Sequence, residues 1–266
     1  MAESVQHLDE IVSIGSFMLV KNERPWIEEH LRNAAPYLDE MVFFDGNSTD
    51  GTLEIIHRAQ KEYGNIRLFE NEDPADLRGE YVRMFNKALC ELKTDWAFFL
   101  HPDMWIENPE RLKEIKDSPG IAMSTKMISY AGNMDELRRI ETGRDNRWKN
   151  IYRRNNPDLG AHYFGWYGAH NEDVYFSSIT GDKHEHFGND FHLYPYEVAD
   201  SGLIIHHFSD VRPYNRRLGR MKTCLMNQGW EISKICEMAE NHPRVTLQDG
   251  NGFKFVKCED PRRVHA

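Results

Sequence analysis

The chain has 266 residues, of which 40% are hydrophobic and 29% are charged, as in a globular protein that can bury a sizeable core. The formal net charge of −10 argues against broad, unspecific binding to nucleic acid, which needs a basic face. The first ten residues are polar and acidic, unlike a signal peptide, and no apolar run approaches membrane-spanning length. The four cysteines lack a CxxC spacing, so we expect reduced thiols in a cytoplasmic protein.

Strand-like and helix-like segments alternate over the first part of the chain. Apolar runs predict strands at residues 11–20, 41–45, 65–69 and 96–100, and the segments after them have the apolar spacing of amphipathic helices. The fourth run is solidly apolar, as expected of a strand covered on both faces. This β-α-β-α order predicts an α/β fold, with the functional groups at the carboxyl ends of the strands.

The alternation stops near residue 116. Beyond it we expect a strand at 120–130, an irregular stretch at 131–200 that is crowded with aromatic and polar residues, and a last strand at 203–208. Residues 213–240 have the spacing of one or two helices.

Two polar clusters end the first two predicted strands. Lys21-Asn22-Glu23 follows the first strand, and DGNSTDGT, from Asp45 to Thr52, follows the second. The second cluster is dense in residues that form tight turns, and its Asp50 can cap the next helix. Asp45 itself lies at the strand tip. Together the clusters indicate a nucleotide pocket at one edge of the sheet.

In this order the two clusters resemble the motifs of family 2 glycosyltransferases, which are inverting enzymes of the GT-A fold. The likeness extends over residues 14–225. It implies a Rossmann-like, mixed but mostly parallel sheet flanked by helices, with a C-terminal helical extension that shapes the acceptor site. It also implies a nucleoside-diphosphate sugar as donor, bound by Lys21, Glu23 and Asp45. Asp45 would accept a hydrogen bond from the nucleobase or ribose; the alternative is a simple turn residue.

The resemblance suggests one domain with two functional halves. Residues 11–116 would bind the nucleotide sugar, residues 117–240 would face a carbohydrate or another hydroxyl-bearing acceptor, and residues 241–266 would form a tail. The oligomeric state is left open.

A metal site is implied at the end of the fourth predicted strand. The family carries an Asp-x-Asp motif there, and this chain has His101-Pro102-Asp103. By resemblance, Asp103 would bind a divalent cation that neutralises the departing diphosphate, and His207 falls where the family has a histidine able to complete the metal sphere. Mn²⁺ accepts imidazole more readily than Mg²⁺, so His101 could be a ligand; it could also bond a phosphate directly or merely fill the strand end.

Several arginines are candidates for contacts with the diphosphate. Arg78 precedes the third predicted helix, where a planar guanidinium can pair with phosphate oxygens. Arg212, Arg216 and Arg220 share one helical face if the helix at 213–240 begins early enough, and they could guide a diphosphate or an anionic acceptor. The alternative for each arginine is a solvated position on the protein surface.

An inverting transferase also needs a carboxylate that takes the proton of the acceptor hydroxyl. We expect Asp173 in this role, with Glu172 second, because other family members carry a Glu-Asp step here. The alternative is an ordinary polar loop.

Other interpretations remain open. His184, His186 and His192 could form a zinc site. The altered metal motif would also suit a non-catalytic nucleotide- or sugar-binding module on the same fold, and a nucleotidyltransferase shares the topology but normally has a glycine-rich phosphate loop. A modified DNA base is a further possible acceptor.

Overall fold

The protein is described here from a computed structural model. It covers residues 12–70, 80–118, 122–142, 147–153, 163–165, 176–178, 183–184, 199–227, 231–250 and 252–264. Over these residues, no helix combines the length and the apolar character needed to cross a membrane.

Four parallel strands form the first half of the sheet. They are β1 (Ile14–Val20), β2 (Glu40–Asp45), β3 (Ile66–Phe69) and β4 (Trp96–Phe99), in the spatial order β4-β1-β2-β3. The apolar runs of β1, β2 and β4 are buried almost completely because helices cover both faces, whereas the edge strand β3 is half-buried beyond Ile66. All four strands predicted in this region are therefore confirmed, each within a few residues.

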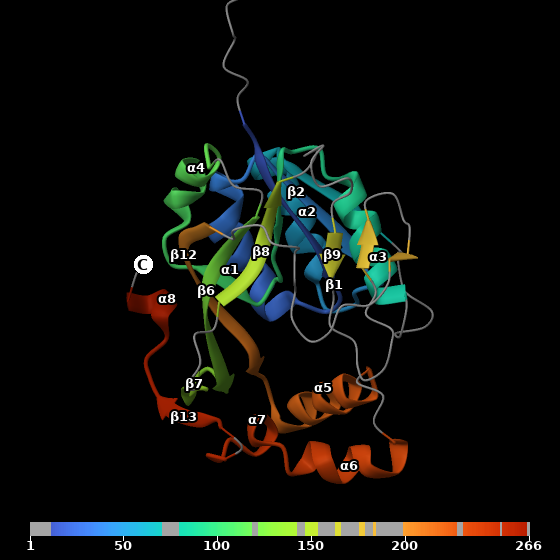
Figure 1. The fold of residues 1–266 in the computed structure, drawn as a ribbon, viewed down its shortest axis with the longest axis vertical. Coiled ribbons are helices and arrows are strands. Elements are labelled where there is room, and N and C mark those ends of the chain that lie inside the picture. The colour runs from blue at the N-terminus through green and yellow to red at the C-terminus, as the bar shows by residue number, and fades with distance from the viewer. Residues whose placement is uncertain are drawn as a thin grey trace, which may run out of the picture.

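Helices α1 (Arg24–Ala34) and α2 (Thr52–Tyr63) pack on one face of these strands, and α3 (Glu80–Glu91) packs on the other. Alternate residues of β2 divide between the two cores, with Phe43 beside α1 and α2, and Phe44 beside α3. Figure 1 shows the sheet between these helices. The mixed α/β fold predicted from the sequence is confirmed.

The second half of the sheet is mostly antiparallel. Strand β8 (Arg147–Arg153) lies between β4 and β6 (Ala122–Gly132), and β7 (Leu137–Glu141) follows on the other side of β6. The long strand β12 (Ala199–Val211) runs parallel to β6 and pairs in the antiparallel sense with the short strand β5 (Met104–Ile106). In this way the last strand predicted from the sequence, at 203–208, comes to lie beside the segment that follows β4.

The expectation of an irregular stretch at 131–200 is wrong for β7 and β8. Both strands are rich in charged residues, and β8 nevertheless occupies a central position in the sheet. Its Ile151 is fully buried, and the oxygen of its buried Asn150 side chain accepts a hydrogen bond from the Thr125 hydroxyl at 3.0 Å. Strands β9 (Tyr163–Gly165), β10 (Phe176–Ser178) and β11 (Lys183–His184) form a small second sheet.

The remaining elements are short helices and a C-terminal layer. Three short helices lie in connections between strands along the chain: η1 (Ala35–Tyr37), η2 (Pro109–Arg111) and α4 (Leu112–Ile115). The C-terminal layer consists of α5 (Tyr214–Asn227), α6 (Ile232–Glu240), α7 (Pro243–Thr246), β13 (Lys254–Lys257) and α8 (Pro261–Val264). Figure 1 places α5, α6 and α7 below the main body. The segment expected as a tail thus contains α7, β13 and α8, and β13 joins the main sheet beside β7.

Candidate active site

The two polar clusters at the tips of β1 and β2 are joined by hydrogen bonds. The Asn22 backbone N–H donates to the Ser48 hydroxyl at 2.9 Å, and the Asn22 side-chain oxygen accepts from the Thr49 N–H at 2.8 Å. One residue later, the Glu23 N–H donates to the Thr52 hydroxyl at 2.9 Å. Asn22 has a φ of 57°, a left-handed conformation that asparagine tolerates better than most residues. These bonds give the edge of the sheet a defined shape.

Asp45 ends β2 directly beside Val20, the last residue of β1. Its side chain is fully buried, and its Oδ2 accepts the Ser48 N–H at 2.9 Å. Among the described residues, its Oδ1 has no hydrogen-bond partner. A buried acceptor without a donor is costly, so a ligand that brings an N–H or O–H to Asp45 would stabilise this arrangement. Lys21, at the tip of β1, is exposed, and its side chain runs past Gly46.

Asp103 lies in the turn between β4 and β5 and is only 6% exposed. Its Oδ1 lies 3.4 Å from the His207 Nε2. Its Oδ2 lies 3.2 Å from an Arg212 nitrogen and 3.8 Å from an Arg220 nitrogen. Its backbone oxygen accepts the Phe208 N–H at 2.9 Å, which fixes the turn to β12. The structure therefore brings together Asp103 and His207, predicted from distant parts of the sequence, and adds two arginines.

Burial alone would raise the pKa of Asp103. The charge of His207, its hydrogen bond to the carboxylate and the charge of Arg220 outweigh this effect and hold the Asp103 pKa well below its usual value of 3.8. Asp103 is therefore an anion at neutral pH. The ring of His101 lies 6.4 Å from the ring of His207, and burial lowers the pKa of His101 to about 3, so His101 is a neutral imidazole.

Glu23 joins this group through Arg212. The same Arg212 nitrogen that faces Asp103 lies 3.5 Å from the Glu23 Oε2, so one guanidinium connects the tip of β1 with the turn after β4. Burial raises the pKa of Glu23 to about 7, and the nearby charge of Asp103 adds to the increase, whereas Arg212 and Arg220 oppose it. Glu23 is thus a carboxyl group that gains and loses its proton near neutral pH.

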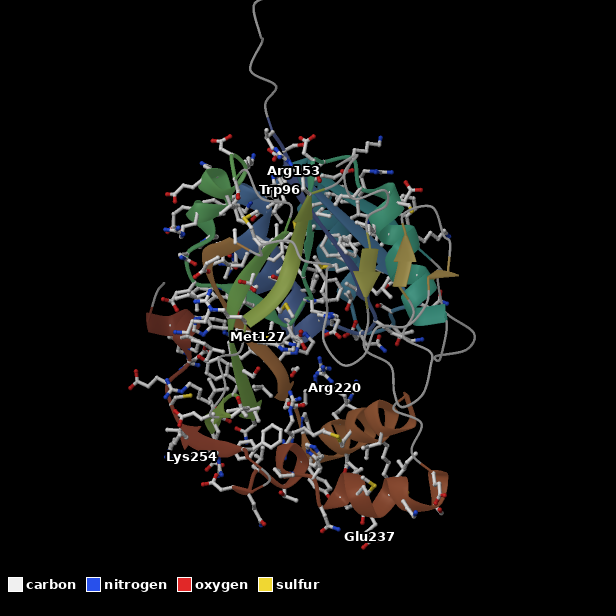
Figure 2. The ribbon with its side chains drawn as sticks, viewed as in Figure 1. Trp96, Met127, Arg153, Arg220, Glu237 and Lys254 are labelled. Carbon is white, nitrogen blue, oxygen red and sulfur yellow. The ribbon has the colours of Figure 1, made fainter. Side chains whose placement is uncertain are left out.

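The predicted arginines occupy different surroundings. Arg220 reaches back from α5, where its guanidinium also donates to the Ser209 backbone oxygen at 2.6 Å; Figure 2 shows it between α5 and the sheet. Arg216 is exposed on α5, and within the described part of the chain it forms no ion pair with the Asp103 carboxylate. Arg212, which the sequence grouped with Arg216 and Arg220, follows β12 directly and donates to the same Ser209 oxygen at 3.0 Å. What distinguishes it from Arg216 is its position between the end of β12 and the start of α5, which the structure defines.

Several predicted residues lie outside the described part of the chain. These are Arg78, Glu172 and Asp173, together with His186 and His192 of the possible zinc site. His184 belongs to β11, but its side chain is not described. The roles proposed for these residues remain predictions from the sequence.

Comparison with known proteins identifies the family. The model described as "Glycosyl transferase family 2" matches residues 17–169, which is more than half of the chain and includes the tips of β1, β2 and β4. The chain belongs to glycosyl transferase family 2. The GT-A type of α/β fold expected for this family is the fold observed here. A search of curated proteins gave no match.

Several solved structures resemble this family member at low identity. The mannosyltransferase PcManGT from Pyrobaculum calidifontis, in complex with GDP-Man and Mn²⁺, is 12% identical over 88% of this chain and 73% of that chain, with a TM-score of 0.47. TarS 1–349 from S. aureus is 16% identical over 87% of this chain and 72% of that chain, with a TM-score of 0.40. Glucosyl-3-phosphoglycerate synthase from Mycobacterium tuberculosis, in complex with Mn²⁺, UDP and phosphoglyceric acid, is 20% identical over 44% of this chain, with a TM-score of 0.34. That last match spans only 43% of the synthase chain.

The side chains around Asp103 are chemically suited to a divalent cation in this family 2 chain. No group of three or more His, Cys, Asp and Glu side chains within the described residues is arranged to hold a metal. However, Mg²⁺ and related ions in phosphate-transfer sites commonly bind one or two protein ligands and take their other ligands from substrate phosphates and water. The Asp103 carboxylate and the His207 imidazole could supply two such ligands, and an oxygen–nitrogen pair suits Mn²⁺ better than Mg²⁺.

Proposed function

We propose that the protein transfers a sugar from a nucleoside-diphosphate sugar to an acceptor hydroxyl, with inversion at the anomeric carbon. The observation that carries this proposal is the Asp103 carboxylate, which faces His207 on one oxygen and Arg212 and Arg220 on the other. An anion held among cationic side chains at the strand tips of a family 2 fold is suited to a metal–diphosphate group. We propose that Asp103 and His207 would hold a divalent cation, which would supply charge neutralisation for the leaving diphosphate.

The chain's own residues would perform the binding and the charge stabilisation. Arg212 and Arg220 would donate hydrogen bonds to the diphosphate oxygens as negative charge grows on them, and the partial burial of Arg212 would strengthen its contact. Asp45 would accept a hydrogen bond from the nucleobase or ribose through its unpartnered Oδ1. Lys21 and Glu23 border the same edge, and Glu23 would help to hold Arg212 in place.

For the acceptor side, the residues are assigned from the sequence alone. Asp173, or Glu172 in its place, would remove the proton of the acceptor hydroxyl as the oxygen attacks the anomeric carbon from the face opposite the diphosphate. His101, which is neutral and close to His207, is better suited to a hydrogen bond with a phosphate oxygen than to electrostatic pairing.

Turnover of the donor tests this proposal. The purified protein would be incubated with Mn²⁺ and each common nucleotide sugar, and release of the nucleoside diphosphate would be measured with and without a panel of sugar acceptors. We expect release from at least one donor, and NMR of the product should show an inverted anomeric centre. Binding of the donor without release or transfer would support the non-catalytic module instead. A product with retained configuration would overturn the inverting mechanism.

A further inference from the structure

Strand β5, which follows Asp103 directly, is held on one side by a helix instead of a strand. In the described part of the chain, β5 pairs with β12 alone. The backbone groups of Met104 and Ile106 find their partners off the sheet: the Met104 oxygen bonds the His30 Nδ1 at 2.9 Å, and the Ile106 oxygen and nitrogen bond the Asn33 side chain at 2.9 and 2.8 Å. The Met104 nitrogen bonds the His101 oxygen at 3.0 Å. His30 and Asn33 thus complete the hydrogen bonding that a neighbouring strand would otherwise supply.

The geometry defines the state of the His30 ring. A carbonyl oxygen can only accept a hydrogen bond, so the proton of the neutral ring must lie on Nδ1. His30 is 1% exposed, and burial lowers its pKa, which keeps the ring neutral. Its Nε2 is buried and has no hydrogen-bond partner among the described residues. An apolar side chain would avoid the cost of this unsatisfied nitrogen, so the Met104 carbonyl is the contact that explains a histidine here.

Two hydrogen bonds, one from β12 and one from α1, hold the turn that carries Asp103. On one side, the Phe208 N–H of β12 bonds the Asp103 backbone oxygen; on the other side, His30 bonds the oxygen of the next residue, Met104. His207 lies opposite Met104 in the pairing of β12 with β5. A displacement of β5 would therefore change the 3.4 Å separation between Asp103 and His207.

We propose that His30 and Asn33 are positioning residues that hold β5 against α1 and thereby set the affinity of the Asp103–His207 pair for a divalent cation with its diphosphate. This inference rests on the proposed function of that pair. Side chains that orient metal ligands without touching the metal commonly change metal affinity by about 10- to 100-fold when they are replaced. His30 and Asn33 lie three residues apart on α1 and so project from the same side of the helix.

The test measures binding of Mn²⁺ in the presence of inorganic pyrophosphate, by electron paramagnetic resonance of the free ion, at a temperature well below the unfolding of every variant. We expect His30→Leu to weaken Mn²⁺ binding about 10-fold or more. His30→Asn keeps an N–H at the δ position and should restore binding to within about 3-fold of wild type. Leu31→Ala is the control, because Leu31 is a buried α1 residue that lies in the main core. It should lower the unfolding temperature and leave Mn²⁺ affinity unchanged.

The outcomes separate this inference from the proposed function. If wild-type protein takes up no Mn²⁺ with pyrophosphate, and Asp103→Asn behaves identically, the proposed metal–diphosphate site fails and the positioning role fails with it. If wild type binds and Asp103→Asn does not, while His30→Leu binds as tightly as Leu31→Ala, the site stands and the positioning role is overturned. Loss of binding in His30→Leu without recovery in His30→Asn would also contradict the hydrogen bond to Met104 as the cause.

Discussion

One guanidinium nitrogen of Arg212 lies 3.2 Å from the Asp103 carboxylate and 3.5 Å from the Glu23 carboxylate. Arg212 immediately follows β12, Glu23 follows β1, and Asp103 follows β4, so a single side chain connects three segments that are far apart in the sequence. In the proposed function this cation has two tasks: it keeps two carboxylates close together, and it offers N–H groups to the diphosphate.

Replacement of Arg212 should therefore affect catalysis more than folding. We expect Arg212→Met to reduce kcat/KM for the nucleotide sugar by about 100-fold or more, because a charged donor to the leaving group is lost. Arg212→Lys should recover only part of the activity, since an ammonium group cannot make two parallel hydrogen bonds. Steady-state kinetics with the active donor would measure both changes. Equal activity of Arg212→Met and wild type would exclude the proposed contact.

Arg220 and Arg216 form a matched pair on the same helix. Both side chains are exposed, but Arg220 lies 3.8 Å from the Asp103 carboxylate, whereas Arg216 forms no ion pair with Asp103 among the described residues. We expect Arg220→Met to lower kcat/KM for the donor by about 10-fold or more and Arg216→Met to change it by less than about 3-fold. The same kinetic assay measures both variants. A decrease in kcat/KM of more than about 3-fold in Arg216→Met would favour the prediction from the sequence that both arginines bind the donor.

Glu23 should make stability depend on pH. Its pKa is raised from 4.5 to about 7 in the folded state, first by burial, so between these values the folded protein holds a proton that the unfolded chain has lost. This group's contribution to the free energy of unfolding therefore falls as pH rises from about 4.5 to 7. Glu23→Gln cannot lose a proton, so its stability relative to wild type should increase over this range by roughly 1–3 kcal/mol.

Urea unfolding of Glu23→Gln and wild type at pH 5, 6, 7 and 8 would measure this difference. The matched control is Glu54→Gln, which alters an exposed carboxyl group on α2 and should show no such trend. A stability difference for Glu23→Gln that stays constant from pH 5 to 8 would show that Glu23 has an ordinary pKa in the folded protein.

Arg262 of α8 should stabilise the C-terminal segment against the sheet. Its guanidinium lies over the Phe208 ring at 4.7 Å and the Trp26 ring at 5.5 Å, and it forms ion pairs with Asp260 and Glu29. We expect Arg262→Leu to lower the free energy of unfolding by about 2 kcal/mol, through loss of these partly buried contacts. The neighbouring exposed residue provides the control: Arg263→Leu should change stability by less than about 0.5 kcal/mol. Urea unfolding monitored by tryptophan fluorescence would measure the stability of each variant. Unfolding curves of Arg262→Leu and Arg263→Leu that coincide would contradict the prediction.

The strands that could be predicted from the sequence are those whose apolar residues occupy buried positions. β1, β2 and β4 are apolar runs covered on both faces, so composition and length located them. The strand β8 was missed because its sequence, RWKNIYR, is largely polar, although its Ile151 is fully buried between β4 and β6. The Arg153 guanidinium of this strand lies over the Trp96 ring at 5.4 Å, which is how a charged residue is accommodated there. Figure 2 shows these two residues near each other.

The site was predictable to a similar extent. Strand tips of a parallel sheet share one edge, so Asp45 and Asp103 could be assigned to that edge, and the family resemblance pointed to His207. Arg212 could not be separated from Arg216 without knowing where β12 ends and α5 begins. His30 and Asn33 act through backbone groups of Met104 and Ile106, more than 70 residues away, and no local pattern reports such contacts.

The most direct measurement of the central claim is calorimetric titration of nucleoside diphosphates into wild-type protein and Asp103→Asn, each with Mn²⁺ and with EDTA. The account predicts that wild type binds at least one nucleoside diphosphate at least 10-fold more tightly with Mn²⁺ than with EDTA. In Asp103→Asn this Mn²⁺ dependence should disappear. Equal binding with and without Mn²⁺ in wild type, or an unchanged Mn²⁺ dependence in Asp103→Asn, would contradict the claim that Asp103 holds the metal–diphosphate group.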